Sequence, residues 1–130
     1  MYILDSDIII WILKGDSAII KSVRTLTSGK VLCISALTVT EIYKNIFPSE
    51  ISKTETLFDK LAIIDVNREI AKDAGYYWQE YCKQFKSISL ADCIIASTAK
   101  MYKATLLTLN TRHFPMKDIR VIDPQVRSKK

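Results

Sequence analysis

Short apolar runs alternate along this chain with longer segments in which apolar residues recur at helical spacing. The apolar runs are typical of buried strands, and they cover residues 2–4, 31–34, 61–66, 105–109 and 119–122. Helices are predicted at about 6–13, 16–28, 38–47, 50–60, 67–85 and 89–103. No two strands are joined by a two-residue hairpin turn. The pattern therefore predicts an α/β fold with three α/β/α layers and a mostly parallel, five-stranded sheet.

The length and composition of the chain fit one such domain. Its 130 residues are 48% apolar, which is enough for one hydrophobic core and too little for two. No linker, repeat or low-complexity tract interrupts the pattern, so residues 1–130 are predicted to form a single domain. No stretch approaches the roughly 18 uninterrupted apolar residues of a membrane span, and no export signal opens the chain. We expect a soluble, cytoplasmic protein without a membrane partner.

The net charge of +5 is spread unevenly. Residues 1–65 hold 7 basic and 8 acidic side chains, whereas residues 66–130 hold 12 basic and 6 acidic ones. This asymmetry suits an anionic partner, for which nucleic acid is the commonest candidate. A basic solvated surface without such a partner fits almost as well, so charge alone does not decide the function.

Cysteine and histidine exclude several kinds of site. Cys33, Cys82 and Cys93 lie inside apolar stretches without a Cys-x-x-Cys pair, which indicates free buried thiols rather than disulfides or a zinc site. His113 is the only histidine, so a ribonuclease built on two histidines is excluded. No Gly-x-Ser-x-Gly turn accompanies it, which disfavours a Ser-His-Asp hydrolase. We interpret His113 as a loop residue, with contact to RNA as the alternative.

Four dispersed polar residues carry the chemical signal. Asp5 follows the first strand, Glu41 and Asp92 stand at predicted helix starts, and Asn110 follows the fourth strand. In a doubly wound sheet these places share the edge outside the carboxyl ends of the strands. Carboxylates gathered there would repel one another unless a cation lay between them, and Mg²⁺ prefers such oxygen ligands. The set indicates metal-dependent phosphodiester hydrolysis, although backbone N–H groups could equally satisfy Asp5.

The other acidic residues also have structural interpretations. Thr38-x-x-Glu41 and Ser89-x-x-Asp92 both match the capping box, in which a carboxylate in the first turn accepts a hydrogen bond from the backbone of the cap residue. Asp7 is expected to be only the cap of the first helix. A carboxylate at a helix start can therefore serve the helix, a metal, or both.

Four segments of the chain resemble PIN-domain nucleases in order and spacing. They are YILDSDIII around Asp5, ISALTVTEI around Glu41, SLADCIIA around Asp92 and LLTLNTRHF around Asn110. The likeness covers nearly the whole chain, and four motifs in order are more specific than any one of them. More narrowly, the chain looks like a VapC-type toxin of bacterial and archaeal toxin-antitoxin pairs.

This resemblance implies an endoribonuclease dependent on Mg²⁺ or Mn²⁺. Asp5, Glu41 and Asp92 would hold the metal, and Asn110 stands where the family has Asp or Asn. An amide can bind a cation or orient a water through its oxygen but supplies no negative charge. The resemblance also implies a homodimer that an antitoxin protein holds inactive.

Further residues follow from the same resemblance. Two hydroxyls would orient the carboxylates or satisfy backbone groups at a strand end, and they belong to Ser6 and Thr108. Four basic side chains near the predicted site edge are candidate RNA contacts or ordinary surface residues, namely Lys44, Lys86, Arg112 and Lys117. Four apolar residues would line an antitoxin groove or belong to the core, namely Trp11, Ile12, Tyr43 and Phe47.

Two other functions remain open on the sequence. Asp5-x-Asp7 after a first strand also resembles the nucleophile motif of haloacid dehalogenase-like phosphatases, although no paired acidic motif follows late in the chain. The other alternative is a nonenzymatic PIN-like interaction module, whose acidic residues would only cap helices.

Overall fold

A computed structural model describes residues 1–125. Its sheet has the strand order β3-β2-β1-β4-β5. The strands are β1 (Tyr2–Leu4), β2 (Leu32–Ser35), β3 (Ala62–Ile64), β4 (Thr105–Leu107) and β5 (Arg120–Ile122). All their pairings are parallel. The α/β fold and the five strands are confirmed, and the described sheet is wholly rather than mostly parallel.

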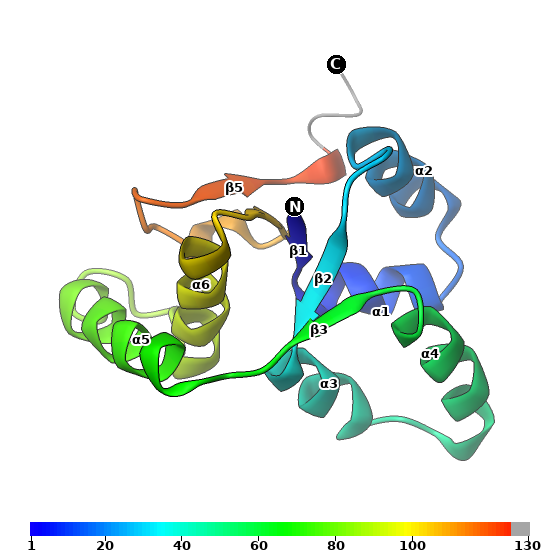
Figure 1. Cartoon of the computed structure of the whole chain (residues 1–130), viewed down its shortest axis with the longest axis horizontal. Helices are drawn as coiled ribbons and strands as arrows, with labels where there is room; N and C mark the ends of the chain where they lie inside the picture. Colours follow the sequence, from blue (N-terminus) through cyan, green and yellow to red (C-terminus); the bar gives the residue numbers. More distant parts are fainter. Residues whose placement is uncertain (126–130) are drawn as a thin grey trace.

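Helices cover both faces of this sheet. They are α1 (Ser6–Leu13), α2 (Ser17–Leu26), α3 (Ala36–Tyr43), α4 (Ile51–Phe58), α5 (Arg68–Tyr81) and α6 (Leu90–Tyr102), with 3₁₀ turns at Pro48–Glu50 and Thr111–His113. Figure 1 shows α5 and α6 on one side of the sheet and α1, α2 and α4 on the other. None of the helices within residues 1–125 is long and apolar enough to cross a bilayer.

The layers produce a core on each face of the sheet. Successive strand residues point to opposite faces, so Ile3 packs under α5 and α6 whereas Leu4 packs under α1 and α2. The same alternation places Cys33 and Leu106 in the first core. Because both faces are covered, the interior positions of the five strands are apolar, as their sequences predicted, and polar residues occur only at strand ends. Cys33, Cys82 and Cys93 are free thiols, and the first and last of them are buried.

The structure corrects the predicted start of α3. Ser35 ends β2 and its Oγ accepts a hydrogen bond from Leu37 N at 3.1 Å, so the helix begins at once. Thr38 is therefore a fully buried interior residue. The capping box predicted for Thr38 and Glu41 is wrong, and Glu41 does not cap the helix.

The helix caps at the starts of α6 and α1 were predicted with different success. The capping box of Ser89 and Asp92 is confirmed at the start of α6. The cap of α1, however, is Asp5 rather than Asp7, because the side chain of Asp5 accepts from Ser6 N. The helix therefore starts directly after β1, and Asp7 lies inside its first turn.

Candidate functional site

The carboxyl edge of β1 and β4 sets the position of Asp5. Asp5 N donates to Leu107 O at 3.0 Å, which extends the strand pairing by one residue and places Asp5 beside Thr108. Thr108 Oγ1 donates to Asp5 Oδ2 at 2.9 Å, and Ser6 N donates to Oδ1 at 2.9 Å. Only 8% of Asp5 is exposed. Both carboxylate oxygens are thus held in fixed directions at the edge of the core.

The pKa of the Asp5 carboxyl is raised to about 7, chiefly by burial and in addition by the negative charges of Asp7 and, more weakly, Asp92. The hydrogen bonds from Thr108 and Ser6 lower the pKa but do not offset the desolvation. Asp5 therefore lies in a place where a negative charge is costly and a nearby cation would stabilise it.

Glu41 reaches the same place from α3. Burial raises the pKa of its carboxyl, Lys44 lowers it, and Asp92 and Asp7 raise it. The side chain of Ser6 also makes a hydrogen bond to Glu41 that lowers the pKa. Glu41 is thus electrostatically coupled to carboxylates from α1 and α6, which are far from it in the sequence.

Asp92 combines a helix cap with a place in this cluster. Its Oδ2 accepts from Ser89 N at 3.0 Å, and Asp92 N donates to Ser89 Oγ at 3.1 Å. His113 Nδ1 lies 3.6 Å from the same Oδ2. The capping role and a role in the site therefore do not exclude each other. His113 lies in the segment between β4 and β5, as predicted, and is a neighbour of Asp92.

Asp7 joins the start of α1 to the segment after β4. Its Oδ2 accepts from Leu109 N at 2.9 Å and from Asn110 Nδ2 at 3.1 Å, and Thr108 Oγ1 lies 3.3 Å away. Its Oδ1 accepts from Ile8 N at 2.7 Å. Burial is the largest cause of the raised pKa of Asp7. The interpretation of Asp7 as a helix cap missed this link, because its partners follow β4.

The four acidic residues Asp5, Asp7, Glu41 and Asp92 are called the acidic cluster below. Within residues 1–125, no three Asp, Glu, His or Cys side chains are arranged closely enough to hold a metal ion between them. Electrostatic coupling nevertheless joins Asp92 to both Asp5 and Glu41. The acidic cluster offers only carboxylate oxygens as metal ligands, and hard divalent cations prefer oxygen ligands of this kind. Their chemistry and unbalanced charge therefore fit such a cation.

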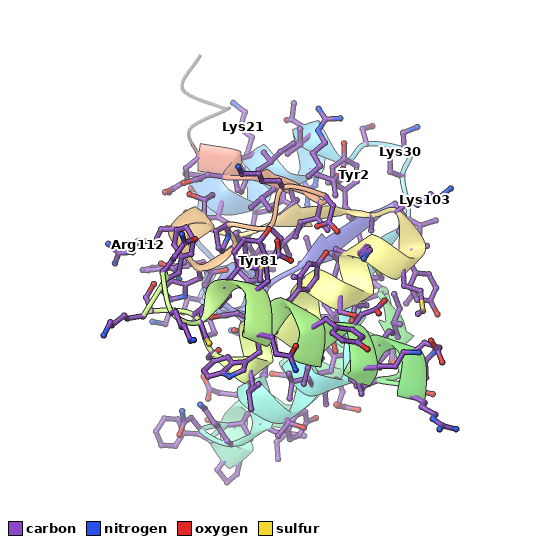
Figure 2. All side chains as sticks on the ribbon, turned by 90° about the vertical axis from the view of Figure 1, so that its left-hand side faces the viewer. Tyr2, Lys21, Lys30, Tyr81, Lys103 and Arg112 are labelled. Carbon is purple, nitrogen blue, oxygen red and sulfur yellow. The ribbon has the colours of Figure 1, made fainter. Side chains whose placement is uncertain are left out.

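The predicted RNA contacts are all exposed, namely Lys44, Lys86, Arg112 and Lys117. Lys44 is close enough to Glu41 to lower its pKa. Arg112 belongs to the 3₁₀ turn that also holds His113. Figure 2 shows Arg112 at one end of the molecule and Lys30 and Lys103, which precede β2 and β4, toward the opposite end.

Sequence reasoning missed an acidic residue at the same sheet edge that acts on the acidic cluster. Asp123 follows β5, and its charge raises the pKa of Asp7. The rule that selected Asp5, a carboxylate directly after a strand, would also have selected Asp123. The position of His113 had no comparable signal, because a 3₁₀ turn that folds back toward α6 leaves no periodic pattern.

A groove of about 330 Å³ adjoins the acidic cluster. Its apolar walls are formed by Ile10, Leu13, Ile42, Ile46 and Phe47, and its polar ones include Lys14, Glu41 and Lys53. Phe47 is 68% exposed. Of the four groove residues predicted from the sequence, Phe47 alone lines this groove. Ile12 and Tyr43 pack against the core, and Trp11 is exposed on α1.

Comparison with known proteins settles the family. The model of the PIN domain family matches residues 2–119. The chain belongs to the PIN-domain family. A relative from Mycobacterium tuberculosis, "Ribonuclease VapC19", is 30% identical over 117 residues, which cover 89% of this chain and 94% of the relative. "Ribonuclease VapC2" from Haemophilus influenzae is 32% identical over 118 residues and covers 87% and 89%. The resemblance to the VapC group is thereby confirmed.

Solved structures share the fold of this PIN-domain chain. VapBC2 from Rickettsia felis, bound to a DNA fragment from its promoter, superposes with a TM-score of 0.80 at 23% identity and covers 93% of this chain and 96% of that one. VapBC-1 from nontypeable Haemophilus influenzae has a TM-score of 0.79 at 27% identity and covers 95% and 97%. At such low identity the first of these similarities shows the fold alone.

Proposed function

We propose that this PIN-domain protein is the ribonuclease toxin of a toxin-antitoxin pair and hydrolyses RNA phosphodiester bonds with the help of Mg²⁺ or Mn²⁺. The observation that carries the metal dependence is the acidic cluster, in which buried Asp5 has a pKa of about 7. The VapC ribonuclease relatives, which match nearly their whole length, support the reaction and the substrate class.

In this proposal Asp5, Glu41 and Asp92 hold the cation. When bound, it supplies a Lewis acid for the phosphoryl oxygen and a water of lowered pKa. The chain's own hydroxyls orient these carboxylates, because Thr108 donates to Asp5 and Ser6 bonds to Glu41. Fixed carboxylate directions reduce the reorganisation that binding requires.

The same residues disfavour the two alternatives. A phosphatase of the haloacid dehalogenase type needs Asp5 as an accessible nucleophile, whereas both oxygens of Asp5 accept hydrogen bonds and the residue is buried. A nonenzymatic module would need its acidic residues only as helix caps, whereas Glu41 caps no helix. Both alternatives also lack support among the relatives.

RNA binding is proposed to use the exposed cations around the acidic cluster. Lys44 is close enough to Glu41 to lower its pKa, and Arg112 precedes His113, the neighbour of Asp92. Lys86 and Lys117 are further exposed cations. Such contacts to phosphates set affinity and its dependence on salt, while the sequence of the RNA is read elsewhere.

Removal of divalent cations is expected to abolish RNA cleavage. Protein treated with EDTA should leave a labelled RNA intact, and millimolar Mg²⁺ or Mn²⁺ should restore cleavage. The same cations should raise the melting temperature, because a ligand that binds only the folded state stabilises it. Ca²⁺ and K⁺ at equal ionic strength separate specific binding from screening. Undiminished cleavage in EDTA would contradict the metal dependence.

The antitoxin is proposed to occupy the groove beside the acidic cluster. The groove has apolar walls from α1, α3 and the segment before α4, and Glu41 lies on its wall. An apolar segment of a partner in this groove would therefore end near the catalytic carboxylates. The structures of VapBC complexes with this fold support such a partner. A homodimer stays a prediction, which light scattering of the purified protein checks.

Replacing Phe47 by Lys is expected to weaken antitoxin binding at least about tenfold, because exposed aromatic anchors in grooves carry much of the binding energy. Calorimetric titration with the product of a small neighbouring reading frame measures this affinity. Tyr76→Lys is the matched control, since Tyr76 is 61% exposed on α5, outside the groove. Equal affinities of the Phe47 and Tyr76 variants would place the antitoxin elsewhere.

A further inference from the structure

The carboxylate of Asp7 holds the side chain of Asn110, although the two residues are 103 positions apart. Asp7 Oδ2 accepts from Asn110 Nδ2 at 3.1 Å and from Leu109 N at 2.9 Å. The other oxygen, Oδ1, accepts from Ile8 N at 2.7 Å. Asp7 is thereby fixed from the side of α1 and fixes the segment that follows β4.

This contact decides which way the amide of Asn110 points. An ionised carboxylate only accepts hydrogen bonds, so Asn110 must turn its NH₂ group toward Asp7. In a planar amide the carbonyl oxygen then points away from Asp7. No group within residues 1–125 donates a hydrogen bond to this Oδ1. Asn110 therefore presents a free acceptor in a fixed direction.

A second chain of hydrogen bonds links the backbone of Asn110 to Asp5. Asn110 N donates to Thr108 Oγ1 at 3.0 Å, and Thr108 Oγ1 donates its single proton to Asp5 Oδ2 at 2.9 Å. The backbone of Asn110 is thus two hydrogen bonds from the carboxylate of Asp5, while Asp7 holds its side chain.

We propose that Asp7 is a positioning residue, which orients Asn110 so that its Oδ1 serves as an acceptor for a cation or a water at the acidic cluster. This inference rests on the proposed function. Asp7 is not one of the three carboxylates proposed to hold the cation, and its oxygens accept hydrogen bonds from Ile8, Leu109 and Asn110. Its effect on catalysis passes through Asn110.

Asp7→Ser tests this role, with Asp16→Ser as the matched control. Serine keeps a polar group at the helix start but is too short to reach Asn110. Asp16 Oδ1 accepts from Ile19 N at 3.0 Å at the start of α2, so the control makes the same chemical change at a helix start outside the acidic cluster. Asp7→Asn is the conservative variant, because its one amide oxygen can take the place of Oδ2.

The first measurement needs neither metal nor RNA. In the ¹H–¹⁵N spectrum of the metal-free protein, the side-chain NH₂ signals of Asn110, identified by their loss in Asn110→Ala, should be widely separated. In Asp7→Ser they should move to the positions of a free amide, and in Asp7→Asn and Asp16→Ser they should stay. Unchanged Asn110 signals in Asp7→Ser would overturn the inference.

The second measurement is the kinetics of RNA cleavage in Mg²⁺. Asp7→Ser should lower kcat by about 10- to 100-fold with little change in KM, as the loss of a group that orients a catalytic residue does. Asn110→Ala should lower kcat to the same extent, and the double variant should be no worse than either alone. Asp7→Asn should restore kcat to within about threefold of wild type.

The outcomes separate the inference from the proposed function. Equal kcat losses in Asp7→Ser and Asp16→Ser, or additive losses in the double variant, would overturn the positioning role while RNA cleavage by the wild type still stands. Wild-type protein that cleaves no RNA in Mg²⁺ or Mn²⁺ would overturn the proposed function and the catalytic part of the inference with it. The amide signals would then still show whether Asp7 holds Asn110.

Discussion

Asp92→Asn is expected to lower the rate of RNA cleavage in Mg²⁺ by about 100-fold or more while the protein stays folded. The amide has the shape of the carboxylate, and its oxygen can still accept from Ser89 N at the start of α6. It lacks the negative charge that holds a cation. A cation contributes several kcal/mol to the stabilisation of transition-state charge, and each 1.4 kcal/mol is a factor of about ten in rate. Initial rates on an end-labelled RNA measure the loss.

Ser89→Ala is the matched control for this variant. It removes the Oγ that accepts from Asp92 N but leaves the carboxylate and the backbone N–H of residue 89 in place. Loss of the cap should reduce the free energy of unfolding by about 1 kcal/mol, with a cleavage rate within about threefold of wild type. If Asp92→Asn cleaves RNA as fast as Ser89→Ala, Asp92 is a helix cap alone.

The second large effect is on stability. In EDTA, the free energy of unfolding is expected to fall as the pH rises from about 4 to about 7, with a slope of up to about 1.4 kcal/mol per pH unit from Asp5. Between the ordinary value of 3.8 and about 7, Asp5 keeps its proton in the folded state and has released it in the unfolded state. Folding is therefore linked to proton uptake in this window. Urea unfolding at a series of pH values measures the slope.

Asp5→Asn isolates this contribution. The raised pKa values of Asp7 and Glu41 act in the same direction and remain in the variant. The stability of Asp5→Asn relative to wild type should therefore grow as the pH rises toward 7 and then stay constant, because Asp5 is ionised in both states above that pH. Parallel stability curves for the two proteins would contradict the raised pKa.

Mg²⁺ should reduce the loss of stability that occurs as the pH rises. A cation binds the ionised carboxylates, so protons compete with it below a pH of about 7. The increase in melting temperature caused by Mg²⁺ should thus be larger at pH 8 than at pH 6. The negative charge of Asp5 thus has two opposite effects. It destabilises the metal-free fold, and it attracts the cation that the proposed reaction needs.

Much of the fold and three of the four carboxylates of the acidic cluster could be predicted from the sequence. An apolar run such as residues 2–4 indicates a strand that is buried on both faces of a parallel sheet. The residue after such a run then lies at the carboxyl edge of the sheet. Asp5 directly follows β1, as that rule predicts, whereas β4 ends at Leu107, three residues before Asn110. Glu41 was found for a partly wrong reason, because its helix begins at Ala36 rather than beside Thr38.

The partners of the polar groups were decided by the tertiary structure alone. Asp7 looked like a helix cap, yet two of its hydrogen bonds go to Leu109 and Asn110. His113 looked like a loop residue, yet it lies beside Asp92. Local periodicity records how deeply a side chain is buried, whereas the partner of a carboxylate depends on which loops meet at the sheet edge. The sequence by itself thus determined the layers, the strands and the edge that holds the acidic residues, and folding decided how those residues are paired, because neighbours 103 positions apart leave no local pattern.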